Sequence, residues 1–63
     1  MRKTYTFYLR GGREPDRFEP VLCRSDVEAM ASARDLLAKH GEREAVEVFF
    51  GEELLFRVAR KVD

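Results

Sequence analysis

The sequence contains few of the features that usually reinforce a very small domain. Among its 63 residues there is one cysteine, Cys23, so a disulfide within the chain is excluded. One histidine, His40, and one cysteine fall short of the clustered ligands of a structural zinc site. At this length, folding buries only about 60% of the surface of the unfolded chain. We therefore expect stability to come from a small, closely packed core, from self-association, or from both.

Charge of either sign is not in excess, since twelve Lys and Arg residues balance twelve Asp and Glu residues. This balance argues against a dedicated nucleic-acid-binding protein, because such domains are normally strongly basic. No apolar run approaches the roughly 20 residues that span a bilayer, and the amino-terminal residues lack the apolar stretch of a signal peptide. With its free thiol, the chain is predicted to be cytoplasmic and to have no membrane partner.

The strongest local signal is a helix predicted over residues 26–40. Ser25 and Glu28 have the spacing of a capping box, in which the serine hydroxyl accepts a hydrogen bond from the glutamate amide and the glutamate side chain reaches back to the serine amide. Gly41 stands where a left-handed residue usually ends a helix. One face of the predicted helix is apolar, and it consists of Ala29, Met30, Ala33, Leu36, Leu37 and His40.

Alternation of apolar and polar residues with period two predicts strands at residues 3–10, 18–23, 44–50 and 53–59, followed by a tail at 60–63 that is expected to fray. Pro20 cannot donate to a strand ladder, which places the second strand at a sheet edge or a bulge. The alternation leaves open which side of this strand faces the core. On one side are Phe18 and Leu22, and on the other are Val21 and Cys23.

These elements make residues 1–63 a single domain with the order β-β-α-β-β. Because one helix covers only one face of a sheet, the predicted fold class is α+β, a two-layer sandwich in which the helix lies on one face of a four-stranded, mostly antiparallel sheet. With the strands in the order second, first, third, fourth, every neighbouring pair is antiparallel and Pro20 stays at an edge. This order is therefore the expected one.

The side of the sheet away from the helix is predicted to be an interaction surface. It mixes aromatic residues with arginines, as interfaces commonly do, and a chain this small gains from additional burial. The candidate interface residues are Thr6, Tyr8, Arg10, Phe49, Leu55 and Arg57. The expected partner is a second copy of the chain, as a dimer, or another protein, because symmetric homodimers are the commonest oligomers. The alternative is an ordinary solvated face with scattered apolar residues.

Single-stranded RNA binding is the alternative function for the same face. Aromatic rings on an open sheet can stack on bases while arginines contact phosphates. The residues that would do so are Tyr8, Arg10, Phe49 and Arg57. The neutral net charge and the presence of Glu47 on this face weigh against it.

No set of residues predicts catalysis, a metal site or a cofactor, so a non-enzymatic protein is expected. Cys23 and His40 lie at opposite ends of the predicted helix, some 20 Å apart at about 1.5 Å per residue. A lone buried cysteine usually acts as a small hydrophobe, and a histidine in the last helical turn suits a capping role. Gly11 and Gly12 beside two arginines resemble a phosphate-binding loop only weakly, because no helix N-terminus follows them. The glutamates between residues 42 and 53 lack the pattern of a calcium loop.

Three segments carry a resemblance to known sequences: Tyr5 to Gly12, Asp26 to Leu37 and Val46 to Leu54. They are similar to small, uncharacterised bacterial domains that begin with an aromatic strand ending in Arg and a glycine turn, continue with an acid-led helix, and close with a Val-x-Val hairpin. The chain departs from them at Pro20 and in the charged turn at 13–17. The resemblance implies the same fold and a bacterial, cytoplasmic setting. Since such families have unknown function, it transfers no site residue.

Overall fold

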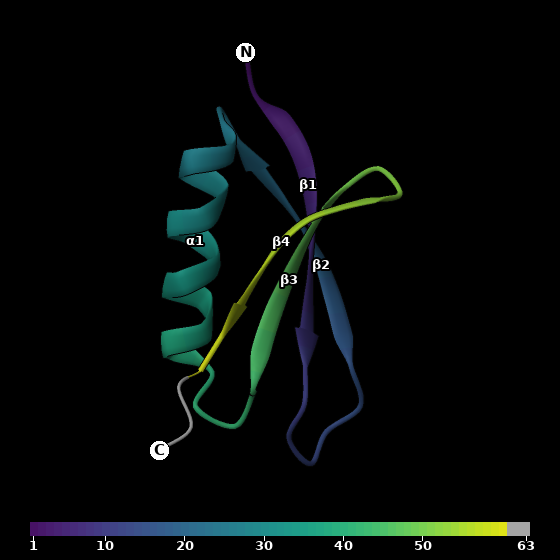
Figure 1. Cartoon of the computed structure of the whole chain (residues 1–63), viewed down its shortest axis with the longest axis vertical. Coiled ribbons are helices and arrows are strands. Elements are labelled where there is room, and N and C mark those ends of the chain that lie inside the picture. The colour runs from purple at the N-terminus through teal and green to yellow at the C-terminus, as the bar shows by residue number, and fades with distance from the viewer. Residues whose placement is uncertain (61–63) are drawn as a thin grey trace.

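The computed structural model describes residues 1–60 and contains one helix and four strands, joined in the order β-β-α-β-β (Figure 1). The elements are β1 (Lys3–Arg10), β2 (Arg17–Cys23), α1 (Asp26–Lys39), β3 (Ala45–Phe50) and β4 (Glu53–Ala59). The strands form one sheet in the order β2-β1-β3-β4, and every neighbouring pair is antiparallel. The predicted α+β class and the expected strand order are both confirmed. Of the predicted tail, residues 61–63 lie outside the described residues.

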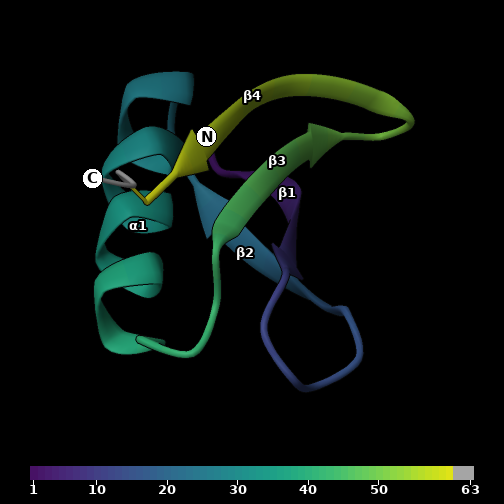
Figure 2. The same cartoon turned by 60° about the horizontal axis from the view of Figure 1, so that its bottom comes forward.

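The helix covers one side of the sheet (Figure 1). Figure 2 shows α1 on one side, whereas within residues 1–60 no helix or strand lies over the other side. Pro20 is on β2, which is an edge strand, so its missing amide proton costs the central ladder little. The β3–β4 turn is tight because Gly51, with φ of 63°, adopts a conformation that favours glycine.

The ends of α1 are fixed by different kinds of contact. At the N-terminus, the Ser25 hydroxyl accepts a hydrogen bond from the Glu28 amide at 3.2 Å, as the capping-box spacing predicts. At the C-terminus the expectation was wrong, because α1 ends at Lys39 with His40 as its C-cap, and Gly41 does not have a positive φ. The His40 amide donates to the carbonyls of the preceding turn.

Arg60, which directly follows β4, donates hydrogen bonds to backbone carbonyls at the C-terminal end of α1. Its Nη2 donates to the carbonyl oxygens of Leu37 at 2.8 Å and His40 at 3.1 Å, and its Nε donates to that of Arg43 at 3.1 Å. Its backbone amide donates to the Glu44 carbonyl. These hydrogen bonds join the first residue of the predicted tail to α1, and a positive charge on the last carbonyls of a helix is favourable.

The core lies between α1 and the sheet. Small residues on the helix, Ala29 and Ala33, let its axis approach the strands, and both are fully buried. The buried side chains that pack together are Tyr5, Phe7, Leu9, Cys23, Ala29, Ala33, Leu37, Val46 and Val48. The Tyr5 hydroxyl donates to the Asp26 carboxylate at 2.6 Å. This hydrogen bond, together with burial, raises the pKa of Tyr5 to about 12.

The structure settles which side of β2 faces the core. Cys23 is fully buried in the core cluster and Val21 packs against that cluster. Phe18 and Leu22 consequently lie on the opposite side, where they are 66% and 57% exposed. Burial also raises the pKa of the Cys23 thiol.

A β-bulge changes the predicted side of Leu55. The register pairs Val48 with Phe56 but Phe49 with Leu54, which leaves Leu55 as the extra residue on β4. Leu55 packs against the core cluster, and Leu54 takes its place opposite Phe49 on the uncovered side, 48% exposed. The predicted placement of Leu55 on the uncovered side is thus corrected to Leu54, because an inserted residue reverses the alternation beyond it.

Candidate functional site: the open face of the sheet

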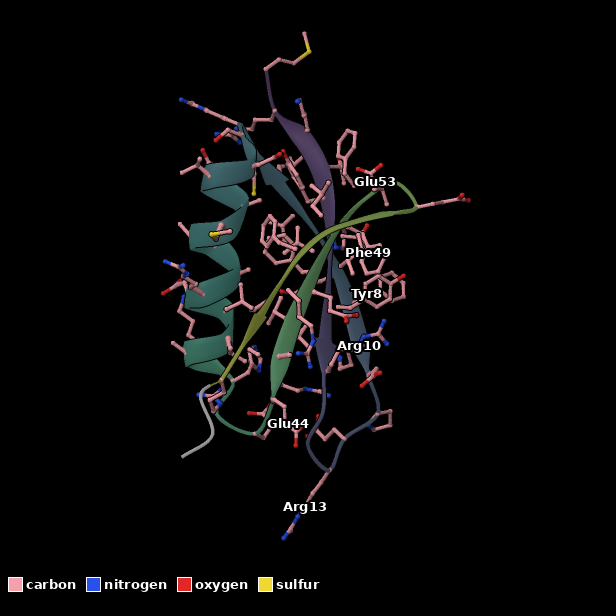
Figure 3. All side chains as sticks on the ribbon, viewed as in Figure 1. Tyr8, Arg10, Arg13, Glu44, Phe49 and Glu53 are labelled. Carbon is pink, nitrogen blue, oxygen red and sulfur yellow. The ribbon has the colours of Figure 1, made fainter. Side chains whose placement is uncertain are left out.

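The uncovered side of the sheet, called the open face below, is built from alternate residues of all four strands. Cross-strand partners share a face, so the register of β1 with β2 and β3, and of β3 with β4, places its members in rows. The open face consists of Thr4, Thr6, Tyr8, Arg10, Phe18, Pro20, Leu22, Ala45, Glu47, Phe49, Leu54, Arg57 and Ala59. Figure 3 shows Tyr8, Arg10 and Phe49 on the side of the sheet away from the helix.

Three aromatic rings form a continuous group that runs across β2, β1 and β3 on the open face. The ring of Tyr8 lies 5.7 Å from that of Phe18 and 5.0 Å from that of Phe49, with an edge-on arrangement in the second pair. These centroid distances lie in the range of favourable aromatic pairs. Tyr8 and Phe49 are half-buried by their neighbours, whereas Phe18 stays mainly exposed. An apolar surface of this kind remains in contact with water in the single chain.

Next to the rings lies an ion cluster of four residues, Arg10, Asp16, Glu47 and Arg57. Arg10 donates from Nε to Glu47 at 2.7 Å and from Nη1 to Asp16 at 2.8 Å. Its guanidinium carbon is also 4.9 Å from the centre of the Tyr8 ring. Arg57 Nε lies 3.6 Å from the other Glu47 oxygen. Two positive and two negative groups make the cluster neutral.

The ion pair between Arg10 and Asp16 changes the pKa of both groups. Hydrogen bonding to Arg10 holds the pKa of Asp16 below its usual range, and the two carboxylates raise the pKa of Arg10. The Arg10 side chain therefore has little freedom to turn toward a phosphate from outside. Its donors are directed across the open face to groups of the same chain.

The position of Asp16 depends on a loop that a buried arginine holds in place. Arg43 is 2% exposed, and its Nη1 donates to the carbonyl oxygens of Gly11, Glu14 and Pro15 at 3.0–3.3 Å. The loop also packs closely against residues 42–44, because Gly11 and Gly12 have φ near +84° and +87° and leave no room for a side chain. The glycine pair thus serves close packing in this structure.

The structure brings most of the predicted interface residues together. Thr6, Tyr8, Arg10, Phe49 and Arg57 share the open face, and Leu55 does not. Three apolar members of the open face, Phe18, Leu22 and Leu54, were not among the predicted interface residues. For β2 a signal was present, since Phe18, Pro20 and Leu22 recur at period two. For Leu54, the bulge that turns it outward left no recognisable mark in the sequence.

Other arrangements offer less for chemistry. Cys23 and His40 stay at opposite ends of the segment that contains the 14-residue helix, and His40 is paired with Glu42 at 3.3 Å. Within residues 1–60 no group of three or more His, Cys, Asp or Glu side chains is arranged to hold a metal ion. A pocket between α1 and β2, lined by Phe7, Val21 and Leu36 among others, has a volume of about 190 Å³, below the roughly 300 Å³ of a typical ligand site.

Comparisons with protein-family models, with curated proteins and with solved structures find no match to this chain. The resemblance to small bacterial domains therefore stays a prediction. Across the described part of the chain, α1 is too short and too polar to cross a bilayer. The fold defines a small α+β domain whose single sheet is covered by the helix on one face only.

Proposed function

We propose that this protein is a non-enzymatic interaction module that binds another protein chain through its open face, in a bacterial cytoplasm. The observation that carries the proposal is the aromatic group Phe18, Tyr8 and Phe49, which the single chain leaves partly in water. Contact with a partner would remove this apolar surface from water, which is worth about 25 cal/mol per Å². Leu22 and Leu54 extend the same apolar area on both sides.

Protein is favoured over nucleic acid by the charges on the open face. The core of a protein interface is enriched in aromatic residues and arginine and depleted of unpaired charge. Here each arginine of the ion cluster is already paired with a carboxylate of the same chain. Such a face can be covered by a protein without leaving an uncompensated buried charge. The free Cys23 thiol supports the reducing setting of the proposal.

A photo-crosslinking experiment tests the proposal in the cells that make this protein. Benzoylphenylalanine in place of Phe18 should give crosslinked products on irradiation, because Phe18 is the most exposed ring of the aromatic group. The same group in place of Val27, which is 80% exposed on α1, is the matched control and should give few. Equal yields from the two positions, or none from either, would refute an interface on the open face.

Single-stranded RNA binding is the second candidate, and the exposed ring of Phe18 beside Tyr8 favours it. If the protein binds single-stranded RNA, its affinity for the RNA should fall steeply as the salt concentration rises. The Arg10→Ala and Tyr8→Ala variants should then lose binding. Because Arg10 and Arg57 are paired with Glu47, we expect no retardation of a single-stranded RNA in a gel shift at low salt. A retarded band that disappears in both variants would favour RNA over protein.

A further inference from the structure

We propose that the partner of the open face is a second copy of this chain, packed sheet against sheet about a two-fold axis near Tyr8. This inference rests on the proposed function and adds the identity of the partner. Tyr8 lies on β1, one of the two inner strands, and has Phe18 on one side and Phe49 on the other. An axis close to Tyr8 therefore brings aromatic rings against aromatic rings.

The charge of the open face is the first argument for self-pairing. In a two-fold dimer the same patch meets itself, so any net charge on it repels its own copy. The ion cluster contains two arginines and two carboxylates within contact distance and has no net charge. Its positive and negative groups can meet those of the second copy without repulsion between excess charges. A face adapted to a charged partner would keep an excess of one sign.

The size of the open face is the second consideration, and it bears on the strength of the contact. Four strands of about seven residues, at about 4.8 Å between strands and 3.4 Å per residue, span roughly 450 Å² of sheet plane. Standard stable interfaces bury about 800 Å² of accessible surface on each partner. The face is thus smaller than a standard interface and falls in the class of weak, transient contacts. We accordingly expect a dimer that dissociates at micromolar concentration.

The geometry follows from packing one twisted sheet on another. Two sheets packed face to face lie about 10 Å apart with their strands within about 30° of each other. The helices then lie on the two outer surfaces of the dimer, because α1 covers the opposite side of each sheet. The dimer has four layers, and its second core consists of Phe18, Leu22 and Leu54 from both copies, with the Tyr8 and Phe49 rings between them.

Sedimentation velocity of the whole chain over a range of micromolar concentrations tests the inference. The wild-type chain should pass from monomer to dimer as concentration rises. Phe18→Ser should raise the dissociation constant at least about tenfold, because a two-fold interface loses the ring twice. Val27→Ser removes an equally exposed apolar side chain from α1 and should leave the dimer unchanged. A monomer at every concentration, or equal effects of the two variants, would overturn self-pairing.

A charge-swap experiment adds a result that only self-pairing produces. Arg57→Glu gives the ion cluster a charge of −2, and Asp16→Lys gives it +2; both side chains are about half exposed, so the fold should tolerate either change. Each variant alone should be monomeric, and an equimolar mixture should form a heterodimer. Circular dichroism confirms folding. A mixture that stays monomeric contradicts the inference.

The two proposals can fail separately. A wild-type chain that is monomeric in solution, but that crosslinks from position 18 to a different protein in cells, would overturn self-pairing and leave the interaction module standing. A chain that neither dimerises nor crosslinks from this position would overturn both. A crosslinked product of twice the chain's mass, together with the heterodimer of the charge-swapped variants, supports both.

Discussion

Replacing Gly12 with alanine is expected to lower the free energy of unfolding by about 2–4 kcal/mol. Its φ of +87° is strained for any L side chain, and an added Cβ would lie 2.2 Å from the Glu42 carbonyl oxygen. Backbone must therefore move on one side or the other. A 63-residue domain has about 3–9 kcal/mol of total stability, so this single methyl group should remove a large part of it.

Two other glycines separate the contributions to this loss. Gly51 has φ of +63° but no atom within 4 Å of an added Cβ, so Gly51→Ala tests backbone strain alone and should cost about 1–2 kcal/mol. Gly41 has neither positive φ nor a close neighbour. Gly41→Ala should be neutral or stabilise by up to about 1 kcal/mol. Urea unfolding measures the free energy of unfolding of the three variants. If Gly12→Ala changes this free energy no more than Gly41→Ala does, the close packing of the loop is contradicted.

Local signals in the sequence were sufficient for the elements and for their order in the sheet. The hydroxyl of Ser25 caps α1 as the spacing indicates, because capping depends on residues three apart. Pro20 fixed the edge position of β2 by chemistry that holds in any sheet. The strand order followed from this edge position and from the expectation that every neighbouring pair is antiparallel. Alternation along the strands placed five of the six predicted interface residues on the correct face.

The errors arise where distant residues decide the structure. Gly41 was expected to end the helix, but Arg60, which is 20 residues from His40, supplies the contacts to the final carbonyls. Leu55 was assigned by strict alternation, which the bulge opposite Val48 and Phe49 interrupts. In the ion cluster, the hydrogen bond from Arg10 to Glu47 joins residues 37 positions apart. No short window of sequence contains such information, so the neutrality of the open face became visible only in the fold.

The second large effect is expected for Arg43→Met. Methionine fills much of the same space but removes the donors to three backbone carbonyls, those of Gly11, Glu14 and Pro15. Hydrogen bonds from a charged donor are worth about 1.5–3 kcal/mol each when buried, and part of this loss is recovered by water at the exposed side of the loop. We expect a net loss of about 2–3 kcal/mol, which lowers the melting temperature by roughly 10–20 °C in a domain of this size.

The matched control is Arg34→Met, which changes an exposed arginine on α1. It should shift the melting temperature by no more than a few degrees, since surface substitutions usually change stability by less than about 0.5 kcal/mol. Thermal unfolding followed by circular dichroism compares the two variants. Equal shifts would mean that the buried guanidinium contributes little to holding the loop.

Arg43 also connects the stability of the loop to the open face. Asp16 ends the segment that Arg43 holds, and it neutralises Arg10 at 2.8 Å. If the loop loosens, Asp16 leaves this position and the remaining cluster of Arg10, Glu47 and Arg57 has a net positive charge. Arg43→Met should therefore weaken the dimer even at temperatures where the chain stays folded, although Arg43 is no part of the open face. Sedimentation velocity well below the melting temperature measures this effect, with Arg34→Met again unchanged. A variant that melts early but dimerises like the wild type would show that loop 11–16 does not control the charge of the interface.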